Sequence, residues 1–314
     1  MIIKECYNVK NGGNNMKKTC DMHIHTEHSD GNLSSSEILQ YATKRGLKKL
    51  SITDHDCVDF YLDEKTIDML KDFDYVTGCE FVCAYGNVPI EILGYGINVK
   101  EAKKYLDMYG INENKIERYR SDYIPKVFAK NGVILDYDPK SIDFTKKSPM
   151  VLEKIHDVIL KNKEAVSFLN KENPNLVKSV SAFLREGINN PKSKIFIAPY
   201  KLYPTYDKIT ALIKKLGGIS FLAHPYQYGD NMDKVLEGVK QYVDGIECYH
   251  YTTREKAKID YLKSFCEKNN LMISGGSDFH VREPNGDDLL NKLDIPAQYF
   301  DEIKARCKLI EYKQ

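Results

Sequence analysis

The sequence predicts an α/β fold in which short strands alternate with helices, and we expect a closed barrel rather than an open sheet. Apolar runs of strand length alternate with helical spacing towards both ends of the chain. Residue types that bind metals follow several of these runs. They would lie at the carboxyl ends of the strands, where α/β barrels have their active sites. No glycine-rich phosphate-binding loop follows the early strands, so a nucleotide-cofactor fold is less favoured.

The first predicted unit is a strand followed by a helix. A strand over residues 20–25 would place His23 and His25 on one face, because side chains alternate along a strand. Both rings could then reach one ion. Ser34 is a suitable N-cap for the helix, which should end near Gly46.

Five further strands continue the pattern. They are predicted over residues 47–53, 75–78, 218–222, 244–248 and 271–275. Potential metal ligands stand after most of them: His55, Glu80, His224, Asp278 and His280. Neutral imidazole and carboxylate groups bind Zn, Mn and Fe, and a mixed set this large exceeds the need of one four-coordinate ion. The sequence therefore predicts a cluster of two or three metal ions.

Several short motifs occur in a recognisable order. They are His23-Ile24-His25-Thr26, Ser29-Asp30-Gly31, Ile52-Thr53-Asp54-His55-Asp56, Gly78-Cys79-Glu80, Leu222-Ala223-His224-Pro225 and Gly275-Gly276-Ser277-Asp278-Phe279-His280. Together they resemble the PHP (polymerase and histidinol phosphatase) family, and more narrowly its stand-alone metal-dependent phosphoesterases. The resemblance covers about residues 19–98 and 195–280. It implies a distorted seven-stranded α/β barrel that holds two or three divalent ions (Mn, Fe or Zn) and hydrolyses phosphate esters.

The resemblance also assigns the ligands to separate ions. It implies that His23, His25, Glu80 and Asp278 hold the first ion, that Asp30, His55 and His280 hold another, and that Glu80 bridges to a middle ion bound by His224. The family usually adds a histidine to the middle site, where this chain has Glu91. A carboxylate can bind the same metals, so we expect a middle site that is biased towards Mn or Fe, or one that is weak or vacant.

Other residues near the motifs have less support. We expect His28 to be a solvated loop residue near the site and His156 to lie on the surface of the middle segment. His250 follows a predicted strand at the active face and is a candidate catalytic residue. Asp54 and Asp56 flank a candidate ligand, and we expect them to be turn residues or residues that orient the ring of His55.

The chain is expected to have three parts. Residues 1–18 lack periodicity and include Met16, so we interpret them as a disordered or non-native extension with translation starting at that methionine. Residues 19–98 and 195–314 would form the barrel. The Lys-rich residues 99–194 show helical spacing without a metal-ligand pair, and we expect a small helical cap over the barrel mouth, where substrate choice is made.

Three basic residues are candidate substrate contacts. The resemblance implies that Arg120 and Lys201, and less directly Arg118, contact substrate phosphate, since fixed cations stabilise charge that develops in phosphoryl transfer. The ordinary alternative is that they are solvated surface charges. The stretch Lys147–Val151 lacks the Arg and His of the family pattern, so part of the substrate pocket should differ.

Composition is consistent with a cytoplasmic enzyme. The net charge is +1, from 46 basic and 45 acidic residues, so no overall field selects nucleic acid or a membrane. No apolar run approaches the ~18 residues needed to span a bilayer. The eight cysteines are scattered and fit reduced, buried thiols. We expect a small phosphorylated substrate or an oligonucleotide end, and no obligatory protein partner.

Three classes of function therefore stay open. The first is a phosphoesterase that acts on a phosphomonoester or phosphodiester of a small metabolite, a nucleotide or an oligonucleotide end. The second is an amidohydrolase-like C–N hydrolase, because such barrels use similar His-x-His and Asp ligands. The third is a non-catalytic PHP module that binds a partner, to which Glu91 lends some weight.

Overall fold

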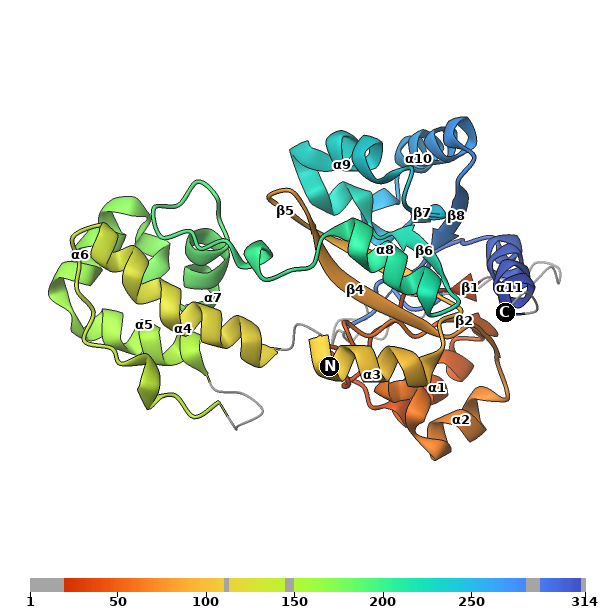
Figure 1. Cartoon of the computed structure of the whole chain (residues 1–314), viewed down its shortest axis with the longest axis horizontal. Helices are drawn as coiled ribbons and strands as arrows, with labels where there is room; N and C mark the ends of the chain where they lie inside the picture. The colour runs from red at the N-terminus through yellow and green to blue at the C-terminus, as the bar shows by residue number, and fades with distance from the viewer. Residues whose placement is uncertain (1–19, 110–112, 145–149, 281–288, 312–314) are drawn as a thin grey trace, which may run out of the picture.

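The structure is a computed structural model that describes residues 20–109, 113–144, 150–280 and 289–311. The predicted extension over residues 1–18 lies outside the described residues. Figure 1 shows a body that contains all the labelled strands, with a helical body beside it that carries the middle of the chain.

Within the described residues the strands form two sheets. β1 (Cys20–Asp21), β2 (Lys49–Leu50) and β3 (Asp74–Tyr75) make a parallel three-stranded sheet in this order. β4 (Gly78–Tyr85), β5 (Val88–Tyr95), β6 (Ile219–Leu222), β7 (Gly245–Tyr249) and β8 (Met272–Gly275) make a five-stranded sheet. β6, β7 and β8 run parallel, whereas β5 is antiparallel to both of its neighbours.

The β4–β5 hairpin departs from the predicted alternation of strands and helices, because two antiparallel strands follow each other directly. Tyr85 pairs with Val88 across the turn, where Gly86 has a φ of +59°. Glycine adopts this left-handed conformation without steric cost, and a Gly-Asn pair between two apolar runs is a hairpin signal. The hairpin places Glu80 inside a strand rather than after its end, and it places Glu91 on the neighbouring strand.

A closed seven-stranded barrel is not confirmed, because the strands pair as two separate sheets. Isolated bridges nevertheless connect the sheets at both ends. Ile24, beyond β1, pairs with Phe279, beyond β8, and the N–H of His25 donates to the carbonyl of Phe279 (2.9 Å). His55, beyond β2, pairs with Glu80 of β4. The bridges bring together the strand ends that carry the candidate ligands.

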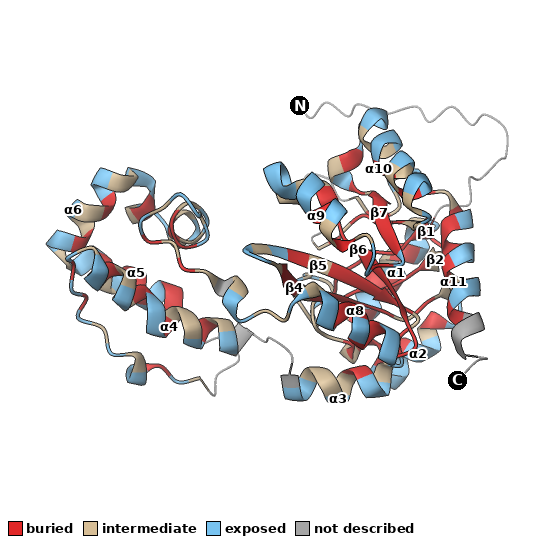
Figure 2. Ribbon diagram, turned by 45° about the horizontal axis from the view of Figure 1, so that its top comes forward, coloured by how far each residue is buried: buried red, intermediate tan, exposed pale blue. Residues whose placement is uncertain are grey.

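Helices cover the outside of the two sheets (Figures 1 and 2). They are α1 (Ser35–Lys44), α2 (Glu64–Leu70), α3 (Val99–Tyr109), α8 (Tyr206–Lys215), α9 (Met232–Val239), α10 (Lys256–Asn269) and α11 (Ala297–Glu311). Short 3-10 segments join them: η1 (Asp59–Leu62), η5 (Pro199–Lys201), η6 (Pro225–Asn231) and η7 (Tyr251–Thr253). The N-cap predicted at Ser34 is confirmed, with a capping box to Glu37, and Gly46 has a positive φ just after the end of α1.

The middle of the chain folds as a helical insertion with a core of its own. Its elements are α4 (Glu113–Lys130), η2 (Pro139–Ser141), α5 (Val151–Lys161), α6 (Lys163–Glu172), η3 (Pro174–Val177), α7 (Val180–Ala182) and a π-helical turn over Phe183–Ile188. Phe128 and Ile155 are fully buried in this core, which extends to Ile195 and Ile197. By contrast, Ala102 of α3 packs on the sheets, so the separate core begins with α4 rather than at residue 99.

Some single-residue expectations can now be compared with the structure. His156 is buried, and its Nε2 lies 3.0 Å from the carbonyl of Leu176, so the prediction of a surface position is wrong. The apolar face of α5 carries this histidine inwards, where the carbonyl satisfies its ring nitrogen. Of the seven cysteines in the described residues, six are buried. In the same residues no helix is both long and apolar enough to cross a membrane.

Because the insertion has a core of its own, truncating a buried residue of this core should destabilise the protein. Replacing the fully buried Phe128 by alanine should lower the free energy of unfolding by about 3–5 kcal/mol, because a cavity replaces the ring. Ile134→Ala, at a 70% exposed position of the same insertion, should cost less than about 0.5 kcal/mol. Denaturant unfolding measures both, and equal costs for the two variants would contradict the assigned core.

Candidate metal centre

The first group of ligands lies at the floor of the centre. His23 and His25 extend from the end of β1, and their ring centroids are 5.1 Å apart. His23 Nε2 lies 3.1 Å from Glu80 Oε2 and 3.3 Å from Asp278 Oδ1. His25 Nε2 lies 3.3 Å and 3.2 Å from the same two oxygens. The four residues assigned to the first ion therefore converge.

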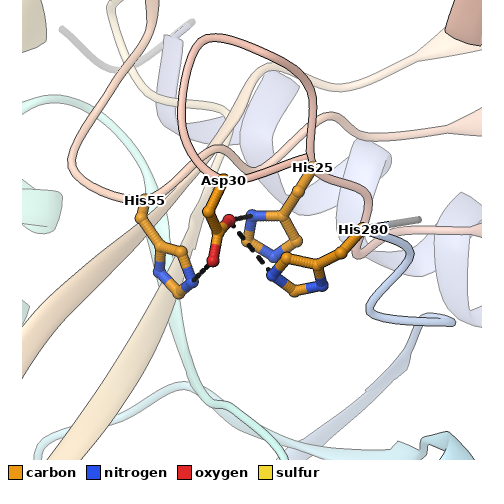
Figure 3. A group of neighbouring side chains, drawn as sticks. All are labelled: His25, Asp30, His55 and His280. Carbon is orange, nitrogen blue, oxygen red and sulfur yellow. Dashed lines mark ion pairs between the residues drawn. The ribbon is translucent and has the colours of Figure 1, made fainter. Parts of the chain in front are cut away.

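The second group lies around Asp30 (Figure 3). Asp30 Oδ1 is 3.1 Å from His280 Nε2 and 3.7 Å from His25 Nδ1, while Asp30 Oδ2 is 3.8 Å from His55 Nε2. In Figure 3 the carboxylate stands between the three rings. The structure thus brings together the residues assigned to another ion, and it adds His25 to them.

The third group contains Glu91, which faces the centre. His224 Nε2 is 3.1 Å from Glu80 Oε1 and 3.1 Å from Glu91 Oε2. His55 Nδ1 is 3.1 Å from Glu80 Oε2 and 4.0 Å from Glu91 Oε1. The third group itself is His55, Glu80 and Glu91, and His224 lies beside it. Glu80 thus takes part in two of the three groups, and the donor atoms within each group lie within 4.8 Å of one another. A carboxylate thus stands where the family pattern has an imidazole.

Buried polar atoms without a hydrogen-bond partner show that metal ions fit these groups. Such atoms include His23 Nε2, His25 Nε2, His55 Nδ1 and Glu80 Oε2. A buried polar atom without a partner costs about 1–3 kcal/mol, so native proteins rarely leave one. Four of them pointing at the same small volume are explained if they are ligands. Mixed imidazole and carboxylate donors suit Mn, Fe or Zn.

The buried carboxylates at the floor of the centre need positive charge close to them. Burial opposes ionisation of Glu80, yet the imidazoles of His23 and His55 outweigh it and hold the pKa of the carboxyl well below its usual range. Burial likewise opposes ionisation of Asp278, and the His23 and His25 rings lower the pKa of this carboxyl as well. Both carboxylates therefore stay charged in a buried place, which protons on the histidines or bound cations must balance.

Sequence reasoning missed Glu247 on β7. Its Oε1 lies 2.9 Å from His23 Nδ1, and its Oε2 accepts a hydrogen bond from the N–H of His224 (2.8 Å). The contact with Nδ1 leaves Nε2 of His23 facing the other candidate ligands, an arrangement that is common for metal-bound histidines. The signal in the sequence was a single acid inside an apolar strand; the residue is fully buried.

Asp54 stabilises a turn, which is one of the two roles predicted for it. Its carboxylate accepts hydrogen bonds from the N–H and hydroxyl of Thr26 (2.7 and 2.8 Å) and from the hydroxyl of Ser29 (2.7 Å). These bonds hold the turn that carries Asp30, rather than orienting the ring of His55. Its backbone position after β2 nevertheless places His55 at the edge of the sheet.

Three residues of the centre have left-handed backbone conformations. The φ angles are +44° for Asp56, +24° for His224 and +54° for Asp278. Such conformations cost about 1–3 kcal/mol for residues other than glycine, and they persist where the surroundings hold them in place. Here the strained residues are two candidate ligands and a neighbour of a third.

His250 lies behind the centre. It is buried, with Nε2 3.2 Å from Asp278 Oδ2 and Nδ1 2.8 Å from the hydroxyl of Thr252. This arrangement suits a residue that positions Asp278. An open cavity of about 360 Å³ lies on the other side of the ligands. It is lined by His55, Glu91, His224, Gln227, Tyr251, Asp278 and His280.

The remaining site candidates lie outside the three groups. His28 is half-buried, and its Nε2 is 2.9 Å from the hydroxyl of Ser35. The guanidinium of Arg118 lies over the ring of Phe144, 4.1 Å from its centroid. Lys201 is exposed on η5.

Arg120 is held more firmly than the other two cations. Its Nη1 lies 2.6 Å from Oε1 of the buried Glu117, whose Oε2 accepts a hydrogen bond from the N–H of Val151 (3.0 Å). Burial raises the pKa of Tyr203, with the charge of Arg120 opposing the rise and that of Glu91 adding to it.

The structure combines a mixed α/β fold with three overlapping groups of His, Asp and Glu side chains that could hold metal ions. The family model described as PHP domain matches residues 21–273, and the chain belongs to the PHP domain family.

The chain is also similar to known proteins in sequence and in structure. A 3',5'-nucleoside bisphosphate phosphatase of Chromobacterium violaceum is 22% identical over 296 residues, which cover 91% of this chain and 96% of the relative. A Bifidobacterium adolescentis protein described as a candidate metal-dependent phosphoesterase has a TM-score of 0.58 at 19% identity, covering 91% of this chain and 95% of its own. A Chromobacterium violaceum protein described as an amidohydrolase, with bound sulfate and no metal, has a TM-score of 0.61 at 18% identity, covering 92% and 96%. The two solved structures establish the fold alone.

Glu247 should control the affinity of the floor for its ion. Glu247→Gln keeps the size of the side chain but weakens the contact with His23 Nδ1, so metal affinity should fall by about 10–100-fold. Competition with a chromogenic chelator measures the affinity. The matched control is Glu237→Gln on α9, whose carboxylate is 60% exposed and pairs with Lys240 just after the end of that helix. Equal affinities for both variants and the parent protein would contradict the role of Glu247.

Glu91 should set the metal preference of the third group. Glu91→His introduces a softer ligand, so the ratio of bound Zn to bound Mn after loading with both metals should rise. Elemental analysis of the loaded protein measures the ratio, with Glu91→Ala as the variant that lacks any ligand. If both variants bind the same metals in the same amounts as the parent protein, Glu91 is not a ligand.

Proposed function

We propose that the protein is a metal-dependent phosphoesterase that hydrolyses a phosphomonoester of a nucleotide or of a similar small phosphorylated molecule. The observation that carries the proposal is a set of three overlapping groups of candidate ligands, two of which contain Glu80, beside an open cavity. The relative named as a nucleoside bisphosphate phosphatase supports a hydrolase of phosphate esters and favours nucleotides. Ions held there would lower the pKa of bound water towards about 7 and neutralise phosphate oxygens.

The burial of the ligands sets the direction from which a substrate approaches. His23, His25 and Glu80 have fully buried side chains, whereas His55 and His280 are about a quarter exposed. The fully buried residues keep water and alternative ligands away from the floor. The partly exposed residues form a rim, so the phosphate group enters on the side of Asp30, His55 and His280.

The helical insertion serves as a cap in this proposal. Arg120, which Glu117 holds in place, and the exposed Lys201 bind a second anionic group of the substrate. A cation already held by a buried carboxylate loses little side-chain freedom on binding. Arg118 is less suited because Phe144 occupies its guanidinium face.

The two sheets belong to one distorted barrel in this proposal. The Ile24–Phe279 and His55–Glu80 bridges, which connect the two sheets, support it.

A C–N hydrolase is the weaker alternative. Such an enzyme would be favoured by a carboxylated lysine among the metal ligands. Among the described residues that line the cavity there is no lysine. The solved structure described as an amidohydrolase shares the fold but, at 18% identity, carries no information on the reaction of this chain.

Metal analysis and a substrate screen test the proposal. Protein purified without chelator should hold at least two equivalents of transition metal, and Mn-loaded protein should release phosphate from nucleotides with a 3'- or 5'-phosphate. His23→Ala and Asp278→Ala should abolish the release, whereas His28→Ala should not, because His28 bonds to Ser35 outside the ligand groups. One equivalent or less, or full activity in excess chelator, would refute the proposal.

A further inference from the structure

Two residues of the cavity lining have no part in metal binding. Five of the seven lining residues belong to the ligand groups or contact Glu80, and the remaining two are Gln227 and Tyr251. Both carry neutral hydrogen-bond donors, an amide N–H and a phenol O–H. Neither residue was singled out by sequence reasoning, and neither lies in a motif that the family resemblance rests on.

The backbone places both side chains at the mouth of the cavity. Gln227 lies on η6, directly after His224, and its N–H donates to the carbonyl of His224 (2.9 Å). Tyr251 begins η7, directly after His250, and its ring centroid lies 4.2 Å from that of His250. Two strand ends, β6 and β7, thus each deliver one donor.

The two donors are linked to each other and to the centre. Gln227 Nε2 lies 3.2 Å from the hydroxyl of Tyr251 and 3.4 Å from Asp278 Oδ2. Asp278 Oδ1 is the oxygen that faces His23 and His25, so Gln227 touches the carboxylate on the side away from the ion site. The amide is therefore close to the ions without being able to bind them through its N–H group.

A phosphate ester in the cavity needs more donors than the ions supply. Its transition state spreads charge over three non-bridging oxygens and the leaving oxygen. Ions neutralise only the oxygens that face them, and fixed donors stabilise charge on the others. In-line displacement puts the leaving oxygen opposite the attacking water, away from the buried floor and towards the mouth. Tyr251, which is 39% exposed, stands at the mouth.

We infer that Gln227 and Tyr251 are the metal-free half of the phosphate site: the Gln227 amide donates to a non-bridging oxygen, and the Tyr251 hydroxyl donates to the leaving oxygen. The inference rests on the proposed phosphoesterase function and deepens it by naming two substrate contacts. The Tyr251 hydroxyl keeps its proton and acts as a hydrogen-bond donor. On substrate binding, both donors exchange their mutual contact for contacts with the ester.

Tyr251→Phe tests the contact with the leaving oxygen. With Mn-loaded protein and a series of aryl phosphates, kcat/KM should fall about 10–100-fold for esters of weakly acidic phenols, and much less for 4-nitrophenyl phosphate. An acidic phenol is stable as the anion and gains little from a hydrogen bond, whereas a weakly acidic phenol gains more. The decrease of log kcat/KM with increasing leaving-group pKa should therefore be steeper for the variant than for the parent protein. Tyr261→Phe is the control, because the Tyr261 hydroxyl bonds Asp233 on the helical surface (2.7 Å). An unchanged dependence would overturn the assignment of Tyr251.

Gln227→Ala tests the contact with the non-bridging oxygen. Inorganic phosphate should inhibit this variant about 10-fold less tightly, while its metal content stays that of the parent protein. Gln298→Ala, at an exposed position of α11, is the control. Unchanged phosphate inhibition would overturn the inference, and so would loss of metal, since Gln227 would then act only by positioning Asp278. A parent protein that hydrolyses neither aryl phosphates nor nucleotides would instead refute the proposed function, and the inference with it.

Discussion

The structure depends on one buried carboxylate, that of Glu80, which is fully removed from solvent and surrounded by imidazoles. Its two oxygens lie 3.1–3.3 Å from ring nitrogens of His23, His25, His55 and His224. A charge buried in this way is stable only if opposite charge meets it at close range. The four histidines follow β1, β2 and β6, which belong to different sheets. The contacts that Glu80 needs therefore connect the two sheets.

The backbone around the centre is shaped to satisfy this requirement. The β4–β5 hairpin places Glu80 and Glu91 on adjacent strands, both facing His224. Left-handed conformations at His224 and Asp278 turn two ligands inwards, at a cost that the surrounding packing offsets. Glu247 and Asp54, which lie outside the ligand groups, hold the first histidine and the turn before Asp30. The left-handed conformations are thus locally unfavourable, and they accompany the convergence of the candidate ligands.

The sheets and the helical insertion have separate hydrophobic cores. The sheets supply a buried floor whose geometry allows little variation, because each ligand takes part in several contacts. The helical insertion has a separate core, so its surface can change without disturbing the centre. Its cation Arg120 is anchored inside the insertion by Glu117.

The sequence by itself determined the types and order of the candidate ligands, the N-cap of α1, the positions of most of the strands and the helical character of the middle segment, because these depend on local chemistry and on the period of side chains along one element. His23 and His25 share a face for this reason alone. Only the tertiary structure decided that β5 runs antiparallel, that His156 is buried, and that Glu247, Gln227 and Tyr251 reach the centre. These positions depend on strand register and packing between segments that lie far apart in the chain, and no local pattern encodes such distances.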